Sequence, residues 1–227
     1  IGLGNIWRFP YVTASNGGGA FLVLYLFALI TAGIPIMILE FSIGHKYRSS
    51  APMAFAKMSR KWEWLGWFQS AVAFFITTYY VAVVAWSLSY VFNGLTLAWG
   101  TDPKAFFFGE YLGLSGGPWE FGGIQWSVFL PMLAVWAVAY FILSKGVKSG
   151  IEKANKFLIP SLMALIAVIV VRGITLPGAV DGLNFLFTPD WSAISKPEIW
   201  VAAYGQIFFS LSIAFAIMVT YSSYLPE

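Results

Sequence analysis

Residues 19–43, which read GAFLVLYLFALITAGIPIMILEFSI, decide the fold class of this chain. A helix needs about 20 mostly apolar residues to cross a membrane, and this stretch exceeds that length with Glu40 as its only charged residue. Similar stretches occupy 65–93, 124–143 and, at shorter length, 157–172, and a fifth at 199–224 is interrupted by polar residues. Only 10% of the 227 residues are charged, against about 25% in soluble domains. We therefore predict an all-α integral membrane protein.

The placement of basic residues predicts the orientation of these helices. Most of the 13 Lys and Arg residues lie in loops 44–64 and 144–156, whereas loops 94–123 and 173–198 are mainly acidic. Cytoplasmic loops carry the excess of Lys and Arg, so we expect 44–64 and 144–156 to face the cytoplasm of a multi-pass plasma-membrane protein. The chain has no cysteine and no Asn-x-Ser/Thr sequon, which favours a prokaryotic source.

The two ends of the sequence suggest a piece of a longer protein. The chain starts without Met and stops directly after an apolar helix. The opening stretch 1–15 is too short to cross the membrane, and we interpret it as the outer half of a helix whose inner half is missing. We expect residues 1–227 to form a single transmembrane domain, in which Asn16 to Gly19 make a tight turn.

The segment Gly2-Leu3-Gly4-Asn5 stands at the predicted start of that half-helix. A helix N-terminus presents free N–H groups and a partial positive charge, so it binds a carboxylate without a basic side chain. Glycine lets a ligand approach the backbone closely. The alternative is a glycine-rich packing site with no ligand.

Two charged residues lie within apolar helices. Arg8 follows Asn5 by about one turn, and a charge at this depth usually faces a cavity or a partner; otherwise it extends to the outer interface. Glu40 needs donors if it is buried, and a broken helix would supply them. Alternatively, Glu40 lies at the cytoplasmic interface.

Within the interrupted stretch, residues 206–215 contain Gln206 and two serines, Ser210 and Ser212, among aromatic residues. Hydroxyl oxygens are hard ligands that suit Na⁺, by the logic of other hard cations. Alternatively, the serines bond back to the preceding turn, as is common in membrane helices. The sequence shows no catalytic set, no phosphate loop and no sign of a nucleic-acid partner, so an enzyme is the least favoured class.

Several uncommon motifs follow one another along nearly the whole chain. They read GLGNIWRFPY at 2–11, NGGGAF at 16–21, GIP at 33–35, LE at 39–40, YY at 79–80, KGVKSGIEK at 145–153, DGLNFLFTPD at 181–190 and GQIFFSLS at 205–212. In this order they closely resemble the neurotransmitter:sodium symporter family. The resemblance implies half of an inverted-repeat transporter bundle with discontinuous helices 1 and 6. The chain would run from the middle of helix 1 through helix 6, and the second repeat would be absent.

The resemblance also implies roles for individual residues. The substrate site would comprise Gly2, Leu3, Gly4, Ile76, Tyr80, Phe209, Ser210, Ser212 and Phe215. Sodium would contact Ile1, Asn5 and Ser210, and a possible chloride ion would contact Tyr25, Gln206 and Ser210. The gates would use Arg8, Phe209, Tyr80 and Tyr224, and Glu40 would brace the broken helix 6.

The same resemblance narrows the substrate. Monoamine carriers have Asp at the position of Gly2, so glycine there implies a substrate that brings its own carboxylate, which indicates an amino acid. We expect a hydrophobic or aromatic one. Ala214 and Ala216 stand where the family often has glycine, so we expect a shorter or stiffer break. The implied function is sodium-coupled symport by alternating access. The implied partners are the amino-acid substrate, the lipid bilayer and the remaining helices of the parent protein. The alternative is a non-transporting membrane scaffold or chaperone on this fold, and a channel is a third possibility.

Overall fold

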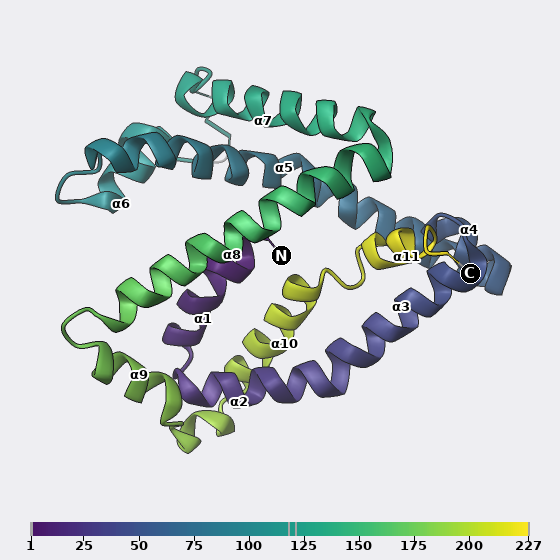
Figure 1. The fold of residues 1–227 in the computed structure, drawn as a ribbon, viewed down its shortest axis with the longest axis horizontal. Coiled ribbons are helices and arrows are strands. Elements are labelled where there is room, and N and C mark those ends of the chain that lie inside the picture. Colours follow the sequence, from purple (N-terminus) through teal and green to yellow (C-terminus); the bar gives the residue numbers. More distant parts are fainter. Residues whose placement is uncertain (1, 118, 121, 227) are drawn as a thin grey trace. The chain divides into compact units, whose positions relative to one another are not determined.

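The structure, a computed structural model, describes residues 2–117, 119–120 and 122–226, and its regular elements there are all helical (Figure 1). In chain order they are η1 Gly4–Arg8, α1 Phe9–Ser15, α2 Gly19–Ala28, η2 Leu29–Gly33, α3 Ile34–Tyr47, α4 Ala51–Met58, η3 Arg60–Trp62, α5 Glu63–Thr96, α6 Pro103–Ala105, η4 Phe106–Tyr111, α7 Trp126–Ser144, η5 Val147–Glu152, α8 Lys153–Ile174, α9 Ala179–Phe187, η6 Trp191–Ser195, α10 Pro197–Leu211 and α11 Ile217–Ser222. The predicted all-α class is confirmed.

Four helices in the described part of the chain are long and apolar enough to cross a membrane. They are Gly19–Tyr47, Arg60–Thr96, Trp126–Ser144 and Val147–Ile174. These correspond to the four uninterrupted stretches that the sequence predicts. Three of the helices extend beyond their apolar stretches, whereas Trp126–Ser144 begins two residues after the predicted start and ends one residue after the predicted end. The largest extension is that of the last helix, which begins ten residues before the predicted start because the π-helix η5 runs directly into α8.

The chain divides into two compact units. The first unit comprises Ile1–Phe75 with Val170–Glu227, and the second comprises Ile76–Ile169. Helix α5 contributes its beginning to the first unit and its larger part to the second. The first unit therefore combines an early and a late segment of the chain, and the second unit lies between them in the sequence.

Within the first unit, α10 packs beside α2 and α11 packs beside α3 (Figure 1). The two helical rods run in the same direction, since Thr31 Oγ1 lies 3.0 Å from Tyr204 Oη near one end, and Gly44 faces Val219 and Ser222 near the other. This is the relative direction that the charge asymmetry predicts. Glycine permits the close approach at the second crossing, because a Cβ at Gly44 would overlap the Val219 carbonyl and the Ser222 hydroxyl.

The opening half-helix packs against α2 of the α2–α3 rod. Residues 16–18 form a tight turn in which Gly17 and Gly18 adopt φ of 88° and 55°, values that favour glycine. The turn brings Phe9 back onto α2, where its ring lies 5.0 Å edge-on from that of Tyr25. The predicted turn at this position is confirmed.

The helix at 199–224 is broken, as its polar residues suggest. α10 ends at Leu211 and α11 resumes at Ile217. Between them, Ser212, Ala214 and Ala216 adopt φ of 52°, 67° and 60°. This left-handed conformation is strained for residues other than glycine. The break therefore forms despite the two alanines, which by propensity favour a continuous helix.

The Gly44 crossing makes a testable prediction about stability. Replacing Gly44 by Ala forces a methyl group against backbone atoms of Val219, and overpacking of this kind costs about 1–3 kcal/mol. We expect Gly44→Ala to lower the thermal unfolding temperature in detergent. Gly182→Ala is the matched control, because its Cβ would meet nothing within 4 Å. Equal melting temperatures for the two variants would contradict the crossing.

Candidate functional site

A cavity of about 450 Å³ lies in the first unit, between the opening half-helix, the α2–α3 rod and the end of α10. Its lining residues are Asn5, Phe9, Tyr25, Met37, Ser210, Leu211 and Met218. They come from three segments that are far apart in the sequence, which the parallel packing of α10 beside α2 brings together. The cavity thus lies where the opening half-helix begins and α10 ends.

Polar groups predicted to contact ions meet in this cavity. Asn5 and Ser210 line it together, and Tyr25 lies on its wall. Gln206 is fully buried, and its Nε2 donates to Ser210 Oγ at 3.1 Å. Two predicted sodium-contact residues and the three predicted chloride-contact residues are therefore neighbours in the fold.

Arg8 belongs to the same polar network. Its Nη1 donates to Gln206 Oε1, and its guanidinium lies 5.2 Å from the centre of the Phe209 ring. Gln206 therefore links Arg8 to Ser210, because it accepts with its oxygen and donates with its nitrogen. The family resemblance assigns Gln206 to the possible chloride site, and its contact with Arg8 was not predicted because the two residues are 198 positions apart in the chain.

Gly4 and Phe209 approach each other closely. Gly4 is buried, and a Cβ at this position would overlap the Phe209 ring. The half-helix therefore begins directly against the aromatic residue that the family resemblance assigns to the substrate site. Gly2, which is exposed, and Leu3, which is half-buried, precede it at the helix start.

Glu40 lies against the helix break. Its side chain is only 3% exposed, and Oε1 accepts a hydrogen bond of 2.7 Å from the amide of Ala214. Its Oε2 is buried, with no hydrogen-bond partner among the described residues. The carboxylate thus supplies an acceptor to a backbone amide that the break releases from helical pairing.

Other predicted site residues lie elsewhere. Ser212 and Phe215 are half-buried within the break, and Tyr224 is exposed beyond the end of α11. Ile76 and Tyr80 lie on α5 in the second unit. Ile1 is outside the described residues. The other described residues of the predicted site belong to the first unit.

Sequence reasoning missed part of the cavity wall. Met37, Leu211, Met218 and Phe9 line the cavity but were not predicted as site residues. Met37 precedes Glu40 by three positions and so shares its helix face, which is a signal that the sequence contains. Met218 lies beyond the break, and its position depends on the break geometry.

Comparison with known proteins gives matches over the whole chain. The sequence model of the Sodium:neurotransmitter symporter family matches residues 1–102 and 98–227. An uncharacterized sodium-dependent transporter of Methanocaldococcus jannaschii is 48% identical over 100% of this chain and 46% of its own length. The sodium-dependent neutral amino acid transporter B(0)AT3 of Mus musculus is 34% identical, over 100% of this chain and 40% of its own.

A solved structure gives the same result for the fold. The crystal structure of MhsT in complex with L-phenylalanine matches with a TM-score of 0.83 and 38% identity, over 100% of this chain and 50% of that chain. The predicted transporter fold is therefore confirmed. The chain spans about half the length of the relatives that it matches.

The Glu40 contact predicts a difference between two substitutions. Glu40→Ala removes the acceptor for the Ala214 amide, and an unsatisfied buried donor costs about 1–3 kcal/mol. Glu40→Gln keeps an acceptor oxygen at the same place. We therefore expect Glu40→Ala to lower the thermal unfolding temperature more than Glu40→Gln does. Equal losses in the two variants would show that the hydrogen bond is not responsible.

Proposed function

The chain belongs to the Sodium:neurotransmitter symporter family, and on that premise we propose that the whole protein is a sodium-coupled symporter for a hydrophobic or aromatic amino acid. The observation that carries the proposal is the cavity that Asn5 and Ser210 line together beside the helix break. In this proposal the chain supplies one side of the transport site, and further helices of the whole protein supply the other side.

The sodium ion is proposed to bind at Asn5 and Ser210. Amide and hydroxyl oxygens are the hard ligands that such a cation prefers. The C-terminal end of α10 adds to this preference, because the free carbonyl groups at a helix C-terminus carry a partial negative charge. Ile1 would contribute its carbonyl to a second sodium ion.

The substrate carboxylate is proposed to bind at Gly2, Leu3 and Gly4. The half-helix begins there, and its partial positive charge favours an anion without a basic side chain. Phe209 lies against Gly4 and would cover the bound substrate, while Ser212 and Phe215 in the break would contact its side chain. The names of relatives support this class, since one is a neutral amino acid transporter and another was crystallised with L-phenylalanine.

Coupling follows from the proximity of these two sites. A substrate carboxylate next to the sodium ion reduces the cost of holding either charge at low dielectric, so each ligand raises the affinity of the other. Alternating access would then open the site to one side of the membrane at a time. Arg8 and Tyr80 would act at the outer gate and Tyr224 at the inner gate, with loops 44–64 and 144–156 in the cytoplasm.

A chloride ion that accompanies sodium is proposed to bind at Tyr25, Gln206 and Ser210. Tyr25 and Ser210 line the same cavity, and the Gln206 side-chain amide donates a hydrogen bond to Ser210 Oγ. These groups offer the donors that an anion needs. Replacing chloride by gluconate in an uptake assay separates this part of the proposal from the sodium site.

The first functional prediction concerns the driving ion. The whole protein, reconstituted in vesicles, is expected to accumulate labelled phenylalanine or leucine when an inward sodium gradient is imposed. A potassium gradient of the same size is expected to give only background uptake. Uptake that is indifferent to sodium would overturn the proposal.

The second functional prediction concerns Asn5. If the loss of the Asn5 oxygen from the sodium ion is similar in size to the loss of a hydrogen bond to a charged group, about 1.5–3 kcal/mol, Asn5→Ala should raise the sodium concentration for half-maximal uptake by about tenfold or more. Asn184→Ala is the control, because Asn184 is an exposed side chain on α9 in the same unit. An unchanged sodium requirement in Asn5→Ala would remove Asn5 from the sodium site.

A further inference from the structure

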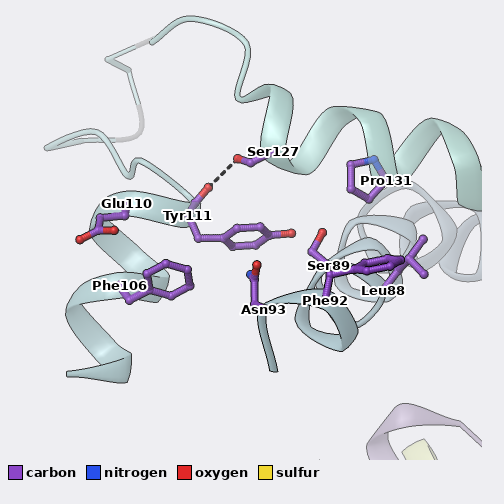
Figure 2. Close-up of a pocket in the computed structure, with 9 residues that line it drawn as sticks. All are labelled: Leu88, Ser89, Phe92, Asn93, Phe106, Glu110, Tyr111, Ser127 and Pro131. Atoms are coloured by element: carbon purple, nitrogen blue, oxygen red, sulfur yellow. Dashed lines mark hydrogen bonds between the residues drawn. The ribbon is translucent and has the colours of Figure 1, made fainter. Parts of the chain in front are cut away.

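The second unit contains a cavity of about 610 Å³ that shares no lining residue with the proposed transport site (Figure 2). It lies between α5, η4 and the start of α7, where Ser127 Oγ donates to the Tyr111 carbonyl at 3.0 Å. Figure 2 shows the Tyr111 hydroxyl directed towards Ser89 and the Glu110 carboxylate directed away from the cavity. The charged residue of this lining therefore does not face a ligand. A charged surface in the first unit defines a ligand more sharply.

This charged surface lies where the chain passes from α3 through α4 and η3 into α5. Residues 41–62 contain no Asp or Glu, but they contain five basic residues, namely Lys46, Arg48, Lys57, Arg60 and Lys61. All five residues are exposed, and we call them the basic corner. Like charges that are gathered in this way repel one another, so the basic corner favours an anion.

Lys57 brings the segments of the basic corner together. Its Nζ donates to the Tyr47 carbonyl at 3.0 Å and also to Ser49 Oγ. The last turn of α4 therefore lies beside the end of α3, where Lys57 offsets the partial negative charge of a helix C-terminus. Lys46, Arg60 and Lys61 form no ion pair with another described residue, so their charges remain for an external anion.

Exposed tryptophan side chains border the basic corner. Trp62, Trp64 and Trp67 have exposed fractions of 44%, 60% and 61%, and Lys61 Nζ lies 5.5 Å from the centre of the Trp62 ring. Tryptophan is typical of the membrane interface, at the level of the lipid headgroups. The surface thus offers positive charge for a phosphate and apolar contact for a lipid, so a membrane lipid fits it better than a free phosphate does.

The other basic loop lacks this combination. Loop 144–156 carries four basic residues but no tryptophan. Its Glu152 pairs with Lys156 at 2.7 Å, which offsets part of the positive charge. Lys145 Nζ lies 3.9 Å from the centre of the Phe141 ring. Because the two loops carry similar numbers of basic residues, a difference in lipid binding between them would report their arrangement and not their charge alone.

The basic corner is linked to the helix break through α4. Ala54 and Phe55 of this helix share a buried cluster with Ala216 in the break and Val219 in α11. An anion that joins α4 to its neighbours in the basic corner would therefore hold α4 against the inner part of the broken helix. A ligand that binds only the folded state raises its stability, so binding can be measured as a rise in the unfolding temperature.

We propose that the basic corner binds the headgroup of an anionic phospholipid, whose negative charge lies among Lys46, Arg60 and Lys61. The lipid's acyl chains lie along Trp62 and Trp64. Anionic lipids give the cytoplasmic leaflet its negative surface potential and attract clusters of basic residues beside membrane-spanning helices. Loop 44–64 is predicted to face that leaflet. The proposal does not depend on the sodium or substrate sites.

The test compares two lipids that have the same acyl chains and differ in net charge. The whole protein in maltoside detergent is titrated with dioleoylphosphatidylglycerol or with dioleoylphosphatidylcholine, and its thermal unfolding temperature is measured. Phosphatidylglycerol is expected to raise this temperature in a saturable manner, whereas phosphatidylcholine is not. Added salt is expected to weaken the effect, because salt screens exposed charges.

Two matched sets of substitutions locate the site. The first set removes three charges from the basic corner through Lys46→Gln, Arg60→Gln and Lys61→Gln. Each basic residue near an anionic lipid surface contributes about fivefold to binding, so this triple variant should bind phosphatidylglycerol up to about a hundredfold more weakly. The control set removes three charges from exposed residues of loop 144–156 through Lys145→Gln, Lys148→Gln and Lys153→Gln. It should leave binding nearly unchanged.

Each variant is compared with its own unfolding temperature without lipid, so a change in folding stability does not enter the comparison. Saturable stabilisation by phosphatidylglycerol that only the first triple variant loses would support the proposal. Equal stabilisation by the two lipids would overturn it. Equal loss in both triple variants would also overturn it, because the effect would then be one of net charge. Equal stabilisation by glycerol phosphate, which has no acyl chains, would make the ligand a free phosphate and would equally overturn it.

Discussion

The hydrogen bond from the Ala214 amide to Glu40 is the contact on which the arrangement of the first unit depends. A helix that stops within a membrane leaves backbone groups that neither water nor lipid can satisfy, so such a break persists only where protein groups replace the lost partners. The α2–α3 rod brings Glu40 to the break, and the break in turn sets the positions of Ser210 before it and Met218 after it. The cavity between Ser210 and Met218 therefore forms because Glu40 replaces the hydrogen bond that the Ala214 amide loses at the break.

Close approach of the helices is the second requirement for this geometry. Gly33 and Gly44 on the α2–α3 rod face α10 and α11, where a Cβ would meet side-chain or backbone atoms. Without attraction between apolar faces in lipid, small residues at helix crossings provide the packing. Gly4 plays the same part for the half-helix, because it lets Phe209 lie against the backbone. Each glycine therefore contributes to the site by bringing polar groups of different helices within reach.

Much of this could be predicted from the sequence, and the remainder was not predictable for physical reasons. Apolar length predicted the spans, and the polar residues around Ser210 predicted the interruption of the last helix. The bond between Arg8 and Gln206 has no local signal, because it joins residues 198 positions apart. The cavity beside Tyr111 was missed because the aromatic run at 106–108 lies in a loop between spans, and only its packing against α5 makes it a wall.

The two alanines in the break show where its stability originates. Ala214 and Ala216 adopt left-handed conformations that cost about 1–2 kcal/mol each for a residue with a Cβ, whereas the same residues favour a continuous helix. The local sequence therefore opposes the break, and tertiary contacts must hold it: the Glu40 carboxylate, and the packing of Ala216 and Val219 against Ile43 and Phe55. Those partners belong to α3 and α4. Residues outside the break at 212–216 therefore determine whether this helix is broken or continuous. A ligand that contacts the break can shift that balance only by its difference in affinity for the two states, and an ion at Ser210, next to the break, would have such a difference.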